Sequence, residues 1–247
     1  MKKRNDRLRI MMMLALTALV MMLNACSDTK LESASATNGD IAIPKAIHLT
    51  EETRQLIDNT FESTRKMQEQ IRNHAESTWL IHTEEVQISL EEYVMAKNNK
   101  ALIWALNELE EKPSDDEQLQ EMIADRLLAS HAKQSGIEVT PDEVHEALDQ
   151  QRTMLRAVDV TDPNHQAILY IMEQRLLMTG LSEEEFWNSE EVYNSYEQSL
   201  YITKLSQQIR SDGNLKGMNS YDELRDQLLT DFMNSRTIEV PDLSEFV

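Results

Sequence analysis

After residue 50, apolar residues recur every three or four positions along most of the chain, which is the spacing of one face of an α-helix. A first helix is expected from about Thr50 to Thr78, with Leu56, Met67 and Ile71 on its apolar side. The chain is also rich in Leu, Met, Ala, Glu and Gln, which favour helices, and it has only five glycines and five prolines. The pattern therefore predicts a mainly α-helical fold.

Capping residues mark where the later helices should begin. A Ser, Thr or Asp that can accept a hydrogen bond from the first turn precedes each apolar stretch, and in most cases a Glu follows three residues later. These starts are Ser89, Ser114, Thr140, Asp162, Ser182 and Ser220. Gly136 and Gly180 should end the helices that begin at Ser114 and Asp162. The helix from Ser182 is expected to continue without a break toward Ile209, and the last helix to end near Met233.

Short β elements are expected at both ends of the helical part. Trp79–Ile81 and Val86–Ile88 flank the polar residues 83–85, which predicts a small β-hairpin. The alternation in Thr237–Val240 predicts a short strand that pairs with 86–88. A small β element would then join the N- and C-terminal parts of the fold.

The first 26 residues have a different pattern. Five basic residues, opposed by Asp6 alone, precede the apolar run Ile10–Leu23, which is too short for a permanent membrane span and has the length of a signal-peptide core. Leu23-Asn24-Ala25-Cys26 follows and resembles a bacterial lipobox, although Asn24 is unusual at its position. We interpret 1–25 as a lipoprotein signal peptide and Cys26 as the residue that takes the lipid.

An uncleaved anchor or a chance cysteine beside an apolar run is the alternative to a lipobox. Cys26 is the only cysteine in the chain and lies at the expected cleavage boundary, which favours the lipobox. The protein would then be extracytoplasmic, held by acyl chains such as palmitate on the outer face of the cell membrane, or on the periplasmic side of a membrane if the envelope has two.

Residues 26–45 are small and polar and are expected to form a flexible tether, with the folded body in 46–247. The formal net charge of the chain is −20, and loss of 1–25 would remove five basic residues and one acidic residue and leave about −24. So acidic a protein should repel nucleic acid and anionic lipid headgroups. Contact with the membrane is therefore expected through the lipid anchor, and nucleic acid is not an expected partner.

Several segments together resemble the SurA/PrsA chaperone family. Ile88–Tyr93 resembles its strand-to-helix opening, and Tyr221–Leu229 with 238–240 resembles its C-terminal segment. Met122–Leu128, followed by His131–Lys133 and Gly136–Val144, resembles its central helix pair. Gly180–Trp187, followed by Tyr196 and Leu200–Leu205, resembles the long helix that comes next. The resemblance extends over residues 80–240 as a pattern of caps, turns and apolar positions.

The family implies a SurA N-terminal-like chaperone domain that binds unfolded exported polypeptides without ATP. Many members also carry a parvulin-type prolyl isomerase domain before the closing helix, but only Ser211–Ser220 occupy that place here, too few residues for a domain. Prolyl isomerase activity is therefore not implied. The opening hairpin also departs from the family, because His82–Glu85 replaces a Val-Asn-Gly-like turn.

The sequence shows no pattern typical of an enzyme. It has no Gly-rich phosphate loop and no Gly-x-Ser-x-Gly turn, and Cys26 is assigned to the lipid. The six histidines are not paired at the i, i+4 spacing that helical metal sites use. We therefore expect no catalytic residues, no metal, no cofactor and no small-molecule substrate.

Methionine and aromatic side chains are the candidates for contact with unfolded clients, because they adapt to many apolar partners. These candidates are Met95, Trp104, Met154, Met172, Trp187, Tyr193 and Tyr196. The same side chains could instead pack the helices together, and both interpretations stay open at this point. The functional hypothesis is a membrane-anchored chaperone; the alternative is a non-catalytic lipoprotein that uses this scaffold for one dedicated partner, with a prolyl isomerase less favoured.

Overall fold

The computed structural model describes residues 49–74, 78–110, 112–159, 161–212, 220–236 and 238. Most of these residues are helical, which confirms the mainly α prediction. In chain order the elements are α2 (Glu51–His74), β1 (Trp79–His82), β2 (Gln87–Ser89), α3 (Leu90–Leu106), α4 (Asp115–Gln134), α5 (Pro141–Arg156), α6 (Pro163–Thr179), α7 (Glu183–Trp187), α8 (Glu190–Asp212) and α9 (Tyr221–Asn234).

The expected helix starts are confirmed by their hydrogen bonds. Ser114, Thr140 and Ser182 each form a reciprocal capping box with the Glu three residues later. Ser89, Asp162 and Ser220 each accept a backbone hydrogen bond from the first helical turn. Gly136, with φ +82°, and Gly180, with φ +69°, take the left-handed conformation that ends α4 and α6.

The hairpin is confirmed as an antiparallel pair of strands, with Ile81 opposite Ile88 and His82 opposite Gln87. Thr83 shapes its turn without a glycine: its backbone N–H donates to the Val86 carbonyl at 2.8 Å, and its hydroxyl accepts from the Val86 N–H at 2.9 Å. Of the expected strand 237–240, the structure describes Ile238 alone, which is not in a strand but packs against the core cluster that holds Ile81 and Ile88. The remainder of that strand lies outside the described residues.

The expectation of one unbroken helix from Ser182 to Ile209 is wrong. α7 ends at Trp187 and α8 begins at Glu190. Asn188 adopts φ −96° and ψ 3° at the end of α7. The Ser189 hydroxyl donates to the Phe186 carbonyl at 2.8 Å and accepts from the Val192 N–H at 3.3 Å. Ser189 thus closes one helix and caps the next, as short polar side chains do at helix starts.

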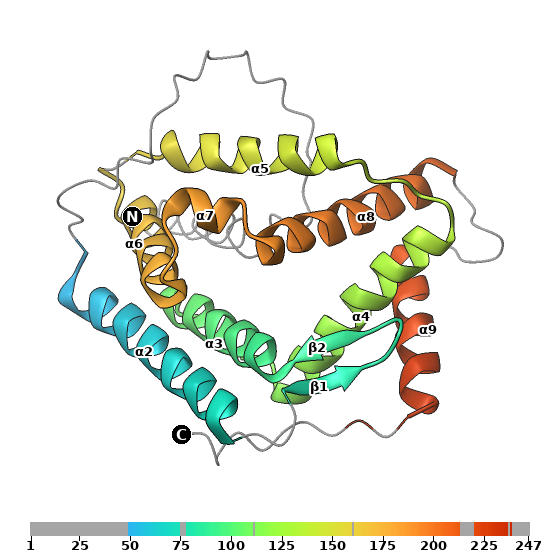
Figure 1. Ribbon diagram of the computed structural model, residues 1–247, viewed down its shortest axis with the longest axis horizontal. Helices are drawn as coiled ribbons and strands as arrows, with labels where there is room; N and C mark the ends of the chain where they lie inside the picture. The colour runs from blue at the N-terminus through green and yellow to red at the C-terminus, as the bar shows by residue number, and fades with distance from the viewer. Residues whose placement is uncertain are drawn as a thin grey trace.

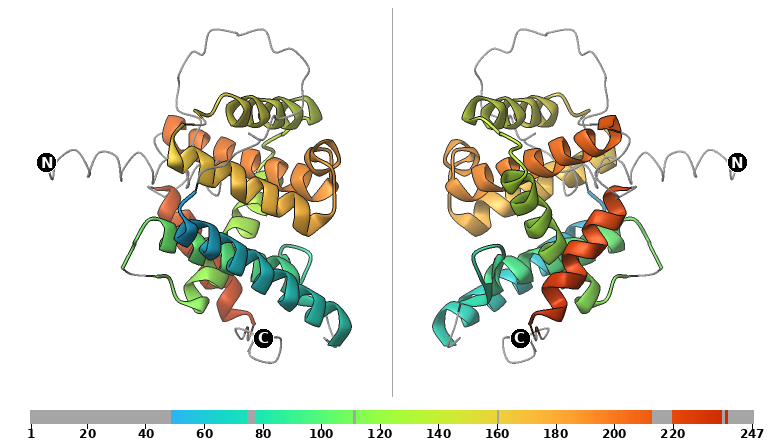
Figure 2. Two further views of the ribbon diagram at one scale, coloured as in Figure 1. Left: turned by 90° about the vertical axis from the view of Figure 1, so that its left-hand side faces the viewer. Right: turned by 90° about the vertical axis from the view of Figure 1, so that its right-hand side faces the viewer.

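The helices form two regions, which Figures 1 and 2 show one above the other. The lower region contains α2, the hairpin, α3 and most of α4 and α9 around an apolar core that we name the hairpin cluster. Its buried members are Ile71, Ile81, Val86, Ile88, Leu90, Tyr93, Val94, Leu119, Ile123, Leu127 and Phe232. The upper region contains α5, α6, α7 and α8.

Two further apolar contacts join the regions. Leu128 of α4 packs with Leu205 of α8 and Leu224 of α9. Ile57 and Phe61 of α2 pack with Tyr170 and residues near it on α6, and the Tyr170 hydroxyl donates to Asp58 Oδ1 at 2.6 Å. The upper region is therefore fixed to the lower one along α8 and α6, while α5 lies on the outer side of α8 (Figure 1).

The expected signal peptide 1–25, Cys26 and the tether 26–45 lie outside the described residues. Among the helices that the structure describes, none has the length and apolar character needed to cross a membrane.

Candidate functional site

Five of the seven predicted client-contacting side chains converge on one apolar core of the upper region, which we name the α5–α8 cluster. Its buried members are Ile103, Val144, Leu148, Leu155, Ile168, Leu169, Met172 and Trp187. Trp104, Tyr193 and Tyr196 are partly buried and pack against it. The cluster thus draws on α3 and on every helix from α5 to α8, and two of the three tryptophans of the chain, Trp187 and Trp104, lie in it or at its edge.

The candidate residues in the cluster differ in exposure. Met172 and Trp187 are each only 5% exposed, so in this conformation they fill the packing role that the sequence left open. Trp104, Tyr193 and Tyr196 are half-buried at the rim. Burial raises the pKa of the Tyr196 hydroxyl to about 12, with the nearby Arg175 charge opposing the shift. Only the rim side chains can reach a partner without movement of the helices.

The other two candidates lie elsewhere. Met95 is half-buried on α3 and is not part of the α5–α8 cluster. Met154 lies on α5 but on its outer side, and it is 41% exposed. Both are therefore separate from the surface that the remaining five residues share.

Helix α5 covers the cluster with one face. Val144, Leu148, Gln151 and Leu155 are buried, and their spacing of four, three and four residues places them on one side of the helix. The opposite side carries exposed polar residues such as Glu146 and Asp149. Full burial of each aliphatic side chain contributes about 1.5–3 kcal/mol, so this face is the main attachment of α5.

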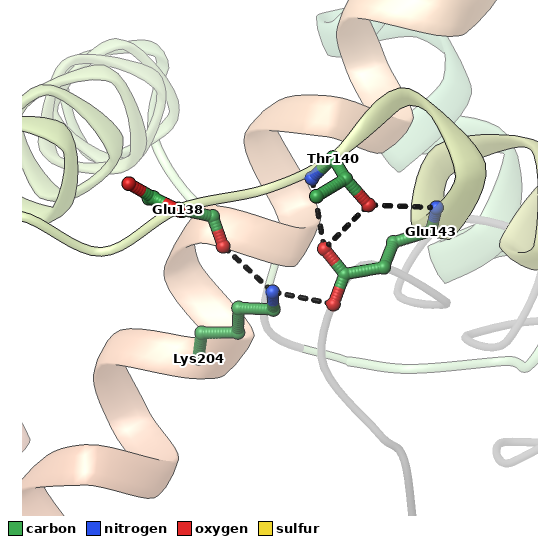
Figure 3. Close-up of polar contacts among 4 residues, drawn as sticks. All are labelled: Glu138, Thr140, Glu143 and Lys204. Atoms are coloured by element: carbon green, nitrogen blue, oxygen red, sulfur yellow. Dashed lines mark hydrogen bonds and ion pairs between the residues drawn. The ribbon is translucent and has the colours of Figure 1, made fainter.

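The N-terminal end of α5 is tied to α8 by Lys204 (Figure 3). Lys204 Nζ donates to Glu143 Oε1 at 2.5 Å and to the Glu138 carbonyl at 2.7 Å. Glu143 Oε2 also accepts from the Thr140 N–H at 2.8 Å, which completes the capping box. The hydrogen bond from Lys204, followed by that from the Thr140 backbone, lowers the pKa of Glu143 to about 2. One carboxylate therefore caps α5 and binds it to α8.

The C-terminal end of α5 faces a second charged contact. Arg152 and Arg156 lie one helical turn apart. Their Nη2 atoms are 4.0 Å and 3.9 Å, respectively, from Glu183 Oε1 at the start of α7. The Glu183 side chain is only 14% exposed, so this contact is better shielded from water than that of Lys204. Helix α5 is thus held by an apolar face in the middle and by opposite charges at its two ends.

Some polar atoms in this region are buried without a hydrogen-bond partner. They are the Nε atoms of Arg152 and Arg175 and the indole Nε1 of Trp187. Burial lowers the pKa of Arg175 from its usual value, while Glu191 and Tyr196 oppose that shift. Buried donors without an acceptor cost free energy. A backbone carbonyl oxygen of a bound polypeptide is an acceptor that would satisfy such donors.

The sequence reasoning did not identify Lys204, Arg152, Arg156 or Glu183 as site residues. Arg152 and Arg156 at i, i+4 on an amphipathic helix were a visible signal, but their partner Glu183 lies on another helix. Glu143 was interpreted as a capping residue, and it has that role as well as the contact with Lys204.

No group of three or more His, Cys, Asp or Glu side chains that could hold a metal ion occurs within the described ranges. His145 instead lies with its ring 5.7 Å from that of Tyr193, edge to face. Comparison of the chain with protein-family models, curated proteins and solved structures finds no match.

Proposed function

We propose that this protein is a lipid-anchored chaperone that binds unfolded exported polypeptides at the α5–α8 cluster without ATP. The observation that carries the proposal is the convergence of Trp104, Met172, Trp187, Tyr193 and Tyr196 on that one cluster. Aromatic and methionine side chains offer a large apolar contact area that accepts many sequences. The proposal joins this cluster to the lipobox pattern at Cys26 and to the resemblance to SurA/PrsA chaperones.

The acidic character of the chain fits this role. A net charge of −20 keeps a protein soluble and separate from its own copies while it holds an aggregation-prone partner. Client binding would bury apolar side chains, and the buried Nε1 of Trp187 would gain a carbonyl acceptor from the client backbone.

The first test measures client binding by the full chain in lipid nanodiscs. Binding of fluorescently labelled, reduced α-lactalbumin, which stays unfolded, is followed by polarisation. We expect binding to be weakened when Tyr193 and Tyr196 at the rim become alanine. The matched control is Tyr221→Ala, because Tyr221 is another half-buried tyrosine but packs between α4, α8 and α9. Equal loss in both variants would contradict the proposed site.

Absence of binding to α-lactalbumin, together with one stoichiometric protein recovered from membranes, would favour the dedicated-partner lipoprotein instead. The anchor is tested separately by growing cells with an alkyne-labelled fatty acid. We expect label on the wild-type chain and none on Cys26→Ser. Label that persists on Cys26→Ser would contradict lipidation at that residue.

A further inference from the structure

Helix α5 has the form of a bound amphipathic segment. Its apolar stripe, Val144, Leu148 and Leu155, lies in the α5–α8 cluster, and its polar side faces solvent. It lies at the outer edge of the upper region and runs back along α8 toward α7 (Figures 1 and 2). The same cluster holds Met172 and Trp187, the two candidate residues that are each only 5% exposed.

The contacts at the two ends of α5 suit a helix that can leave and return. The Lys204–Glu143 pair has side chains 30% and 39% exposed, so water and salt compete for both charges. At the other end, the Nη2 atoms of Arg152 and Arg156 lie 4.0 and 3.9 Å from Glu183 Oε1, which is longer than a hydrogen bond. Opposite charges at separated ends also fix the direction in which a segment docks, since reversal would bring like charges together.

The turn before α5 has open space next to one residue, Gly136. Gly136 has φ +82°, and a side chain added there would meet no atom within 4 Å. Glycine enters this left-handed conformation, and leaves it, without the steric penalty of other residues. No neighbouring atom at Gly136 therefore opposes a change of direction there, whereas Ile137 and Val139, which follow it, pack against the adjoining clusters.

We propose that α5 is a displaceable cover, and that a client segment takes its place on the α5–α8 cluster. The preferred segment carries apolar residues at three- and four-residue spacing, an acidic group that meets Lys204 and a basic group that meets Glu183. This inference rests on the proposed chaperone function and adds to it how Met172 and Trp187 become available and which client sequences are selected.

Covalent closure of α5 tests the proposal. A carbodiimide joins an amine and a carboxylate that touch, with loss of water, so it can convert the Lys204–Glu143 ion pair into an amide. The full chain in nanodiscs is treated and the 143–204 link is quantified by mass spectrometry. Binding of labelled, reduced α-lactalbumin is then compared with that of the untreated chain. We expect affinity to fall by about tenfold or more, because the closed state cannot open.

The matched control is Lys204→Arg, which keeps the positive charge but offers no amine to the carbodiimide. Treated Lys204→Arg should bind the client as well as untreated Lys204→Arg does. Since both proteins carry the same other lysines, the difference between them isolates the 143–204 link. If the wild type binds the client equally well before and after complete linkage, α5 is not a displaceable cover. The chaperone function would still hold in that case, because the protein binds the client.

Hydrogen exchange gives a second, independent measurement on the untreated full chain. Addition of the client should speed exchange of the amides in 141–156, because displaced α5 loses its protection. Binding to an outer surface would leave this exchange unchanged or slow it, and that result would overturn the proposal even if linkage reduced affinity. Absence of any client binding by the untreated chain would overturn the chaperone function and the cover together.

Discussion

The hairpin cluster and the α5–α8 cluster are both apolar cores of one chain, but they are built differently. Nine of the eleven buried members of the hairpin cluster are aliphatic, the exceptions being Tyr93 and Phe232, and Ile71, Val86, Ile88, Val94 and Ile123 have no exposed surface at all. The α5–α8 cluster relies on large aromatic side chains, four of them only half-buried, and has buried nitrogen atoms of Arg152, Arg175 and Trp187 without hydrogen-bond partners.

The difference indicates which region is the scaffold and which can open. Aliphatic side chains that are fully buried and closely packed gain no further contact from a ligand. Half-buried rings gain buried apolar area from a ligand, and unsatisfied donors gain a hydrogen-bond acceptor. Local opening in proteins draws on the regions of lowest stability. We therefore expect the hairpin cluster to set the global stability and the α5–α8 cluster to respond to ligands. Four measurements test this comparison.

The largest effect is expected in the hairpin cluster. Ile123→Ala removes a side chain with no exposed surface, and the resulting cavity should lower the free energy of unfolding by about 3–4 kcal/mol. Denaturant unfolding measures this change. A loss below about 1 kcal/mol would mean that this core collapses around the cavity and is not the rigid scaffold.

The next effect concerns Asp125 of α4, a carboxyl whose pKa is raised chiefly by burial. Burial, aided by Glu121, raises the pKa of Asp125 to about 6, although Arg225 of α9, Arg126 of α4 and Lys100 of α3 oppose the shift. The folded state therefore holds this proton more tightly than the unfolded chain does. Its stabilising contribution is full below about pH 4 and is lost as the pH rises through about 6.

In measurement, the free energy of unfolding of Asp125→Asn should exceed that of the wild type near neutral pH by about 2–3 kcal/mol, and the gap should close toward about pH 4. The Tyr221 hydroxyl on α9, whose own pKa burial raises to about 12, is a second group near this carboxylate and stays neutral over the range. A gap that is the same at both ends of the range would show that Asp125 does not titrate in the folded state.

A third, smaller global effect is expected from Leu148→Ala on α5. The change should weaken docking of α5 by about 2 kcal/mol and speed amide exchange in 141–156 by about 30-fold. The free energy of global unfolding should fall by no more than the free energy that keeps α5 docked. The reason is that the protein can also unfold from the state in which α5 has already detached. The control Glu146→Ala, on the exposed side of α5, should change neither quantity. Equal acceleration of amides throughout the protein would contradict the comparison.

The smallest change in stability is expected from Lys204→Met, about 0.5 kcal/mol, because the ion pair with Glu143 is partly exposed. The substitution should have a larger effect on the pKa of the Glu143 carboxyl. The pKa of Glu143 is about 2, so its contribution is present above about pH 4.5 and is lost as the pH falls through about 2. An NMR titration of the Glu143 side chain should show this midpoint rising in Lys204→Met.

Lys133→Met is the matched control for that titration, since it breaks a different α8 ion pair, the one with Glu197. It should leave the Glu143 midpoint where it is in the wild type. A shift of similar size in both variants would mean that the general charge of the molecule, rather than the Lys204 contact, holds the Glu143 pKa low.

Local signals in the sequence predicted much of the fold. Each capping residue from Ser89 to Ser220 forms hydrogen bonds within the next three residues, so a helix start can be recognised from neighbouring positions in the sequence. The hairpin strands followed from two short apolar runs. The break at Asn188–Ser189 was missed because the glutamates on both sides of it favour a helix, and only the two hydrogen bonds of the Ser189 hydroxyl show that two helices meet there.

The composition of the candidate site could be read from the sequence only in part, because the sequence shows residue types but not the contacts between distant helices. The aromatic and methionine candidates were visible by residue type, but their burial depends on which helix lies over them. The contacts of Lys204 with Glu143 and of Arg156 with Glu183 join residues far apart in the chain, and no local pattern encodes such pairs. The role of α5 as a cover emerges only from those contacts together.

The two residues between α7 and α8 also set the angle between the directions in which the side chains of the two helices point. A helix turns by about 100° per residue, so on one continuous helix the side chains of Trp187 and Tyr193 would point about 120° apart. The interruption at Asn188–Ser189 resets that angle and lets both rings reach the same cluster. The length of this link is therefore as much a determinant of the surface as either aromatic residue: one residue added there would rotate α7 and turn its tryptophan away from its partners.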